Sequence, residues 1–187
     1  PLMRTIHWKR CIGQNRIKNV LASAVARDNL GHAYLLCGLR GYGTIAAACD
    51  LAEALLCERA EEAPCGSCPS CAQFQSHDHP DFHLVHPLAL QKEHKSSDSS
   101  LNERGWEYLR TTCREIIENP YRSPEFDRKP TLPVEWVREM NHAVIRGPLA
   151  AERNIVIISD IDVMQKESAN ALLKTLEEPP AGTLIIC

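Results

Sequence analysis

Apolar side chains recur along this chain with two spacings, one typical of helices and one typical of buried strands. From residue 17 to residue 25 they recur every three or four positions, which places them on one face of a helix. The same spacing predicts further helices at 44–56, within 106–118, at 134–145 and at 165–178. Short continuous apolar runs predict strands at 33–37, 82–86, 154–159 and 183–187.

The order of these elements predicts the fold class. Strands separated by helices are typical of βαβ units and of a parallel sheet. Helices on both faces of that sheet would make a three-layer α/β/α domain, and 187 residues suffice for one such domain with a small appendage. Residues 88–105 are polar, serine-rich and without period, which predicts a loop. Prolines then interrupt the chain at Pro120, Pro124, Pro130 and Pro133.

A glycine-rich loop joins the first predicted strand to the next helix. Its sequence, Gly38-Leu-Arg-Gly41-Tyr-Gly43-Thr44-Ile45, has the glycine spacing of the nucleotide-binding loop G-x-x-x-x-G-K-[ST]. In that loop backbone N–H groups hold the phosphates, the lysine reaches the outer phosphates, and the hydroxyl binds Mg²⁺. Here Thr44 stands in place of the lysine and Ile45 in place of the hydroxyl. We therefore predict a degenerate phosphate loop that does not bind ATP.

The apolar run at 154–159 ends in acidic residues. An ATPase with this order of elements places a magnesium-binding Asp at the end of such a strand. Asp160 has a suitable position, although a shift of one residue in register would turn its side chain to the other face. Asp160 and Asp162 are equally suited to leading the strand into a solvated turn. The residues alone leave both interpretations open.

Nine cysteines occur in the chain, and four of them are grouped. Cys65, Cys68 and Cys71 form a C-x₂-C-x₂-C run, and Cys57 lies eight positions upstream. Four thiolates make the closed tetrahedral shell of a structural zinc site, with no open position for catalysis. An iron–sulfur cluster is the rival interpretation, but the ferredoxin run would need a further Cys where Gln75 stands.

The fourth zinc ligand has alternatives in the sequence. His77, His79 and His83 follow the cysteine run closely and could replace Cys57. We expect Cys57, because it completes an all-thiolate set. Clustered cysteines are more often metal ligands than disulfides in a chain without a secretory signal, and no run approaches the ~20 residues of a membrane span. We therefore expect a cytoplasmic protein.

The net charge of −3 is close to neutral, so no global basic field attracts nucleic acid. The cysteine segment is flanked by acidic residues and lacks interleaved aromatic and basic side chains, which argues against direct DNA binding there. The end of the chain at Cys187 is apolar, whereas natural termini are usually polar. We therefore expect a fragment cut at or near a domain edge.

Several motifs together resemble one family. The segment Asn170-Ala-Leu-Leu-Lys-Thr-Leu-Glu-Glu-Pro-Pro180 resembles a signature of the bacterial DNA polymerase III clamp-loader subunits, gamma/tau and delta prime. The resemblance extends to His32-Ala-Tyr-Leu-Leu36 before the glycine loop, to Ile12-Gly13-Gln14, to the four-cysteine insertion and to His79-Pro80-Asp81. It covers most of the chain except about 88–133.

The resemblance implies a P-loop domain of the AAA+ type, related to RecA. Residues 1–187 would form the N-terminal domain, with a zinc module at 57–76 and a lineage-specific loop and helix expansion at 88–133. The lid and collar domains of the family would be absent. A Ser-Arg-Cys motif that offers an arginine finger to a neighbour's ATP would lie beyond residue 187.

The resemblance also favours one type of subunit. Aligned on the segment 170–180, Ser159 takes the place of the magnesium Asp, and Asp160 that of the adjacent Glu. Gamma/tau subunits hydrolyse ATP, whereas delta prime often carries a degenerate loop, so the chain resembles the non-hydrolysing delta prime stator. No catalytic residue is then expected. The implied partners are gamma/tau and delta within the polymerase III holoenzyme, and the sliding clamp and primed DNA through the assembled complex.

Two other functions remain as alternatives. The first is an active ATPase of the gamma/tau type, in which Arg40 would supply positive charge and Asp160 would hold the metal. The second is a zinc-centred module that binds nucleic acid or takes part in redox chemistry.

Overall fold

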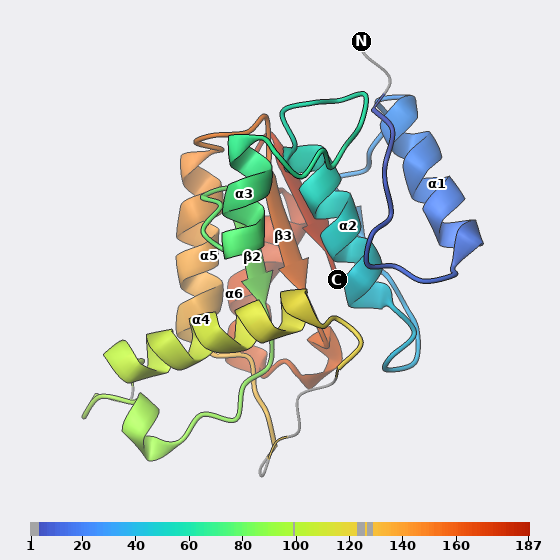
Figure 1. Ribbon diagram of the computed structural model, residues 1–187. Helices are drawn as coiled ribbons and strands as arrows, with labels where there is room; N and C mark the ends of the chain where they lie inside the picture. The colour runs from blue at the N-terminus through green and yellow to red at the C-terminus, as the bar shows by residue number, and fades with distance from the viewer. Residues whose placement is uncertain (1–3, 99, 123–125, 127–128) are drawn as a thin grey trace.

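The computed structural model describes residues 4–98, 100–122, 126 and 129–187. In this part of the chain a parallel four-stranded sheet with the order β1-β4-β3-β2 forms the centre (Figure 1). The strands are β1 (Ala33–Tyr34), β2 (Phe82–Val85), β3 (Asn154–Ile158) and β4 (Thr183–Ile186). The predicted parallel sheet is confirmed. The inner position of β3 and β4 explains why their sequences are continuous apolar runs.

Helices cover both faces of this sheet (Figure 1). They are α1 (Asn15–Ala26), α2 (Thr44–Leu56), α3 (Pro69–Ser76), α4 (Glu103–Glu118), α5 (Val134–Arg146) and α6 (Lys166–Glu177), with 3₁₀ turns η1 (Lys92–His94) and η2 (Ile161–Val163). Successive residues of β3 point to opposite faces. Ile155 and Ile157 pack in a cluster with α1 and α2, whereas Val156 and Ile158 pack in a second cluster with α5 and α6. The predicted three-layer arrangement is therefore confirmed.

Helix α2 carries the sites described below and is buried from its third residue to its end. Two of its buried residues, Asp50 and Glu53, are acidic. The guanidinium of Arg10 contacts Glu53 at 2.6 Å and Asp50 at 3.3 Å. Asp50 also accepts hydrogen bonds from the backbone N–H groups of Arg10 and Cys11, both at 2.9 Å. Because a buried charge without its partner is costly, these contacts hold the N-terminal segment along α2.

Residues 88–105 differ from the predicted loop, because they contain η1 and the first residues of α4. The side chain of Asn102 caps α4 by accepting a hydrogen bond from the Gly105 N–H at 3.0 Å, and its amide donates to the Glu93 carbonyl at 2.8 Å. These contacts are local and polar. They leave no apolar period in the sequence, which is why the pattern did not indicate this structure.

Two smaller differences concern element lengths. Helix α3 was not predicted, because eight residues are too few for a clear helical period. Strand β1 is shorter than the predicted 33–37, although the Leu36 N–H still donates to the Cys187 carbonyl at 2.7 Å. Pro124 lies outside the described residues. Within the described ranges, no helix has both the length and the apolar character needed to cross a membrane.

Candidate nucleotide pocket and candidate metal centre

The glycine loop connects β1 to α2 at the edge of the sheet where the parallel strands end. Gly41 and Gly43 have φ of 80° and 88°, a conformation that residues with a Cβ rarely adopt. Gly43 is the N-cap of α2 and provides no side chain, so the first turn of the helix has no side-chain cap. Free N–H groups and the helix dipole favour an anion at such a position. The backbone of a phosphate loop is therefore retained.

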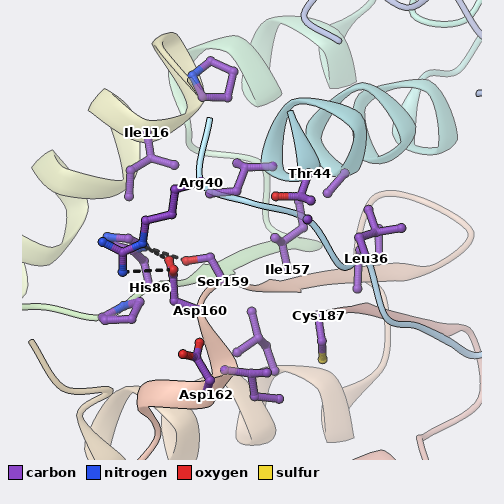
Figure 2. Close-up of a pocket in the computed structure, with 18 of the residues that line it drawn as sticks. Leu36, Arg40, Thr44, His86, Ile116, Ile157, Ser159, Asp160, Asp162 and Cys187 are labelled. Carbon is purple, nitrogen blue, oxygen red and sulfur yellow. Dashed lines mark hydrogen bonds and ion pairs between the residues drawn. The ribbon is translucent and has the colours of Figure 1, made fainter. Parts of the chain in front are cut away.

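A cavity of about 510 Å³ adjoins this loop (Figure 2). Its walls come from the loop, from the ends of β2 and β3, and from the segment that follows α4; the lining includes Arg40, Thr44, Ile45, His86, Ser159 and Asp160. The structure thus brings the predicted loop residues and the predicted strand-end residues to one place. Open α/β sheets bind ligands at this edge.

The side chains at the two key loop positions supply no positive charge. Thr44 has a hydroxyl but no ammonium group, and its methyl carbon lies close to Gly38, where an added Cβ would be 3.2 Å away. Ile45 offers only apolar atoms to the cavity. The loop therefore has the backbone for phosphates but lacks the side chains that bind them.

The strand end resolves the register that the sequence left open. The Ser159 N–H donates to the Val85 carbonyl at 3.0 Å, so Ser159 continues the pairing of β3 with β2. Asp160 follows with φ of 46°, outside the strand. Its carboxylate lies 3.3 Å from the Arg40 guanidinium (Figure 2). A serine thus directly follows β3, and the next residue, Asp160, is paired with Arg40.

His86 is a polar residue of the cavity that sequence reasoning missed. Its Nδ1 forms a hydrogen bond of 2.6 Å with the Ser159 hydroxyl. The same atom lies 4.0 Å from the Asp160 carboxylate. Burial lowers the pKa of His86 to about 4, against the opposing effect of the Asp160 charge. The imidazole is therefore neutral at pH 7 and adds no positive charge to the cavity. Because His86 follows β2 and Ser159 follows β3, no local sequence signal could have paired them.

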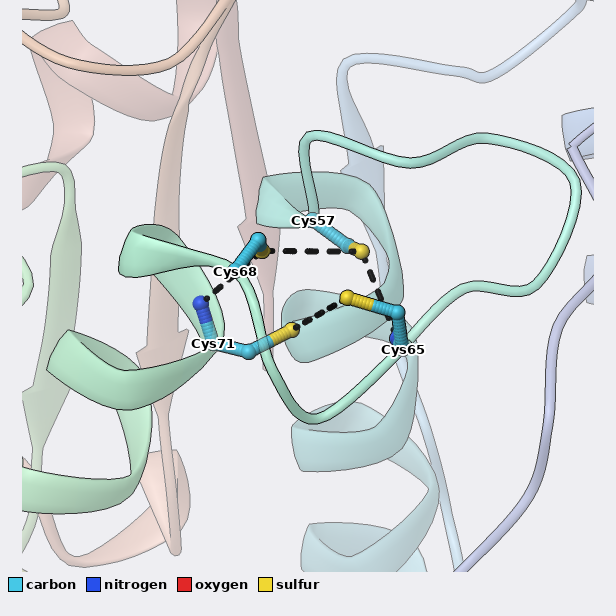
Figure 3. Close-up of side chains that lie close together, drawn as sticks. All are labelled: Cys57, Cys65, Cys68 and Cys71. Carbon is cyan, nitrogen blue, oxygen red and sulfur yellow. Dashed lines mark hydrogen bonds between the residues drawn. The ribbon is translucent and has the colours of Figure 1, made fainter.

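The four grouped cysteines converge at the other end of α2 (Figure 3). All four Sγ atoms lie within 4.8 Å of one another. The Sγ atoms of Cys57 and Cys68 are 3.9 Å apart, and those of Cys65 and Cys71 are 4.0 Å apart. A tetrahedral metal with metal–sulfur bonds of about 2.3 Å places its sulfur atoms about 3.8 Å apart. The four thiols are therefore spaced to hold one metal ion.

Local structure explains how the four side chains reach this arrangement. Cys57 is the C-cap of α2, and Cys68 is the N-cap of α3, where its sulfur accepts a hydrogen bond from the Cys71 N–H at 3.4 Å. The Cys57 sulfur likewise accepts from the N–H groups of Arg59 and Cys65, each at 3.4 Å. Hydrogen bonds to ligand sulfurs orient and stabilise them as thiolates. The arrangement is built by two helix ends and the turn between them.

The four thiols differ in pKa and in exposure to solvent. The backbone N–H of Ser67 is the main reason that the pKa of Cys65 falls to about 6. Burial raises the pKa values of Cys57 and Cys71 above their usual range. Three of the cysteines are buried and Cys65 is partly exposed. Metal binding to such a group must displace protons, so it is coupled to pH.

The histidines considered as alternative ligands have other surroundings. The group that the described residues form contains none of them. His79 Nε2 lies 3.3 Å from the Ser70 hydroxyl, and its Nδ1 accepts a hydrogen bond from the Asp81 N–H. His83 lies in β2, and His77 Nε2 lies 3.9 Å from the Glu118 carboxylate. The geometry places Cys57 as the fourth member of the group.

Comparison with known proteins identifies the family of this chain. Residues 13–187 match the sequence model of the family described as DNA polymerase III, delta subunit. The chain belongs to this family. The delta' subunit of DNA polymerase III from Bacillus subtilis is 30% identical over 182 residues, covering 97% of this chain and 43% of that protein. The delta' subunit from Pseudomonas aeruginosa is 30% identical over 161 residues, covering 86% of this chain and 38% of that protein.

The tau subunits of DNA polymerase III match as well. The Escherichia coli tau subunit is 27% identical over 170 residues, covering 90% of this chain and 20% of that protein. The chain therefore spans less than half the length of the curated relatives that it matches. Membership in the DNA polymerase III delta subunit family confirms the resemblance drawn from 170–180 and the other motifs.

Proposed function

We propose that this chain forms the nucleotide-loop domain of a delta-prime subunit of the DNA polymerase III clamp loader, which acts as a stator and does not hydrolyse ATP. The observation that supports this proposal is the content of the cavity at the start of α2. The positions that would supply a lysine, a hydroxyl and a metal-binding aspartate carry Thr44, Ile45 and Ser159. Arg40 and Asp160, which both line the cavity, form an ion pair.

The magnitude of these losses favours a silent site. A charge-assisted hydrogen bond to phosphate contributes about 1.5–3 kcal/mol. Losing the lysine and the magnesium contact together would weaken nucleotide binding by about 10²–10⁴-fold. Such a loss would take a site with a dissociation constant of about 1 μM to one of roughly 0.1–10 mM. In a ring of related subunits, a domain of this kind would serve as a rigid surface against which a neighbour's ATP site is completed.

The partners and the place of this domain follow from the same proposal. The domain would assemble with gamma/tau and delta subunits, and it would act on the sliding clamp and primed DNA only through that assembly, in the cytoplasm. Residues 1–187 would form the N-terminal AAA+ domain, with 57–76 as its metal module and 88–133 as its expansion. The lid and collar domains and an arginine-finger motif would follow in the complete protein.

The metal in the cysteine group is proposed to be a structural Zn²⁺. An all-thiolate tetrahedral shell with Sγ distances of 3.9 and 4.0 Å suits a single zinc ion. An iron–sulfur cluster places several iron atoms between its thiolates, and so needs them further apart. The four thiolates of Cys57, Cys65, Cys68 and Cys71 would fill every coordination position. No position would remain for a water molecule, so the zinc ion could not catalyse hydrolysis.

Calorimetric titration of the full-length protein with Mg·ATP tests the proposal. We expect no saturable heat at nucleotide concentrations up to about 1 mM, because the phosphate contacts are missing. Co-elution with the gamma/tau subunit of the same organism in size-exclusion chromatography provides the matching positive result. Micromolar affinity for Mg·ATP would refute the silent site.

An active ATPase of the gamma/tau type is the second candidate, and one observation favours it. Arg40 and Asp160 both line the cavity and could separate to meet a phosphate and a metal. Steady-state ATP turnover by the full-length protein that is abolished by Asp160→Ala would support this candidate. Turnover that survives Asp160→Ala would point to a contaminating ATPase.

A further inference from the structure

The segment after α4 crosses the glycine loop that begins the silent site. Helix α4 ends at Glu118, and a turn follows in which the Arg122 N–H donates to the Asn119 carbonyl at 3.0 Å. Pro120 and Arg122 line the cavity beside the loop. Tyr121 lies between these two residues in the turn but is not part of the cavity lining, and it faces Gly43 instead. The expansion at 88–133 therefore contributes side chains to the nucleotide pocket.

Tyr121 bridges the N-terminal segment and the glycine loop. Its hydroxyl accepts a hydrogen bond from the Ile12 N–H at 2.6 Å. The same hydroxyl lies against Gly43, so that a Cβ added there would be 3.0 Å from the oxygen and 3.3 Å from a ring carbon. The ring also packs against a small cluster formed by Cys11, Ala46 and Ala47. Tyr121 thus contacts both the N-terminal segment and the first turn of α2.

The position beside Gly43 is the one that matters for nucleotide binding. Glycines in phosphate loops lack a Cβ so that phosphates can approach the backbone N–H groups closely. Gly43 keeps that conformation, with φ of 88°, but a phenol fills its open side. A ligand approaching the first turn of α2 from this side would have to displace the ring and its hydrogen bond to Ile12.

We propose that Tyr121 occludes the phosphate loop. The expansion would then block nucleoside triphosphates sterically, in addition to the loss of the loop side chains that would bind them. The inference rests on the proposed silent site and adds a second, independent cause of its silence. It also gives residues around 119–122 a role, which is to hold the loop and the N-terminal segment together where other phosphate loops hold a ligand.

Restoring the missing loop side chains separates the two causes. Four forms of the full-length protein are titrated with Mg·ATP: the native protein, Tyr121→Ala, Thr44→Lys/Ile45→Thr, and the triple variant that combines these changes. We expect measurable binding in the triple variant and binding at least about tenfold weaker in Thr44→Lys/Ile45→Thr with Tyr121 present. Tyr121→Phe in the restored background is the matched control, and it should stay as weak as the form with tyrosine, since the ring remains.

The outcomes distinguish this inference from the proposed function. Binding by the native protein would refute the silent site itself. Equal affinities in the two restored forms, including failure of both to bind, would overturn occlusion by Tyr121 while leaving the silent site intact. Tight binding by Tyr121→Phe but not by the form with tyrosine would overturn occlusion by the ring, because the hydroxyl alone would then be the obstacle.

A stability measurement tests the underlying contact without nucleotide. Gly43→Ala strains the backbone equally with or without Tyr121, so that strain cancels when the two backgrounds are compared. The clash with the phenol does not cancel. We expect Gly43→Ala to lower the melting temperature more in the native background than in Tyr121→Ala, and equal decreases would contradict the contact.

Discussion

The two ends of helix α2 carry sites of opposite kinds. At its start the backbone of a phosphate loop is intact, but the side chains that would bind a ligand are replaced or bound to one another. At its end Cys57 joins three other thiols that lie at the spacing of a metal shell. The comparison separates two properties of a site, the backbone that shapes it and the donor atoms that it presents, because binding depends on both.

The two ends of α2 differ in how their polar groups are paired. At the loop end Arg40 pairs with Asp160 and His86 bonds Ser159, while His86 Nε2 has no hydrogen-bond partner among the described residues. At the cysteine end the sulfur atoms lie 3.9 and 4.0 Å from their nearest counterparts, where a shared cation would satisfy all of them at once. The loop end therefore holds side chains that pair with one another, whereas the cysteine end directs four sulfur atoms toward one another.

Removing a thiol should produce the largest effect. We expect Cys71→Ser to lower the free energy of unfolding by about 3–5 kcal/mol, a fraction of the roughly 10–16 kcal/mol that zinc supplies to small zinc-dependent domains. Urea unfolding and metal content by mass spectrometry would measure this loss, with about one zinc per native chain. The control is Cys37→Ser, an exposed cysteine outside the group. Equal stability of the two variants would show that the four thiols hold no stabilising metal.

Acid should destabilise the loop end through His86. Burial keeps its folded pKa at about 4, below the ordinary value of 6.5, while Asp160 opposes this shift and Arg40 adds to it. The unfolded chain therefore takes up a proton as the pH falls from about 6.5 to 4, and the folded chain does not. The stability of the native protein should fall by up to about 3 kcal/mol through this group.

The comparison of the native protein with His86→Gln isolates this contribution. Burial also lowers the pKa values of His77, His79 and His83, so some decline in acid will remain in the variant. Urea unfolding at several pH values between 4 and 7 should give a shallower dependence on pH for His86→Gln. Parallel curves would show that this histidine does not titrate with folding.

The ion pair between Arg40 and Asp160 should contribute least to the free energy of unfolding. The Arg40 side chain is 65% exposed, and exposed ion pairs contribute about 0–1 kcal/mol and weaken with salt. Arg40→Ala should therefore change the free energy of unfolding by less than about 1 kcal/mol. Arg122→Ala is a matched control, since Arg122 lines the same cavity and forms no ion pair with any described residue. A loss of several kcal/mol from Arg40→Ala would mean that the pair holds the loop closed.

Much of the fold followed from local pattern, and the differences have a common cause. The helix predicted at 44–56 matches α2, and the apolar runs matched strands, because burial of one or both faces leaves a period in the sequence. Residues 88–105 escaped prediction because Asn102 and its neighbours form polar, local contacts. Helix α3 escaped because its eight residues are too few to show a helical period.

The candidate sites divide in the same way. The glycine spacing of 38–45 and the run from Cys65 to Cys71 were visible in the sequence, since a loop or a ligand set leaves a short motif. The bond between His86 and Ser159 and the contact of Tyr121 with Gly43 were not. Each joins residues more than 70 positions apart, and only the packing of separate elements brings them together.

The sequence by itself determined the donor atoms at both ends of α2: four thiols at one end, and no lysine or metal ligand in the loop at the other. These are properties of residue type, which folding cannot change. The tertiary structure alone decided the register of Ser159 and Asp160, the fourth member of the cysteine group, and the placement of Tyr121 over Gly43. Those depend on how the strands align and how the segment after α4 returns to the loop, because contacts between distant elements leave no mark in a local pattern.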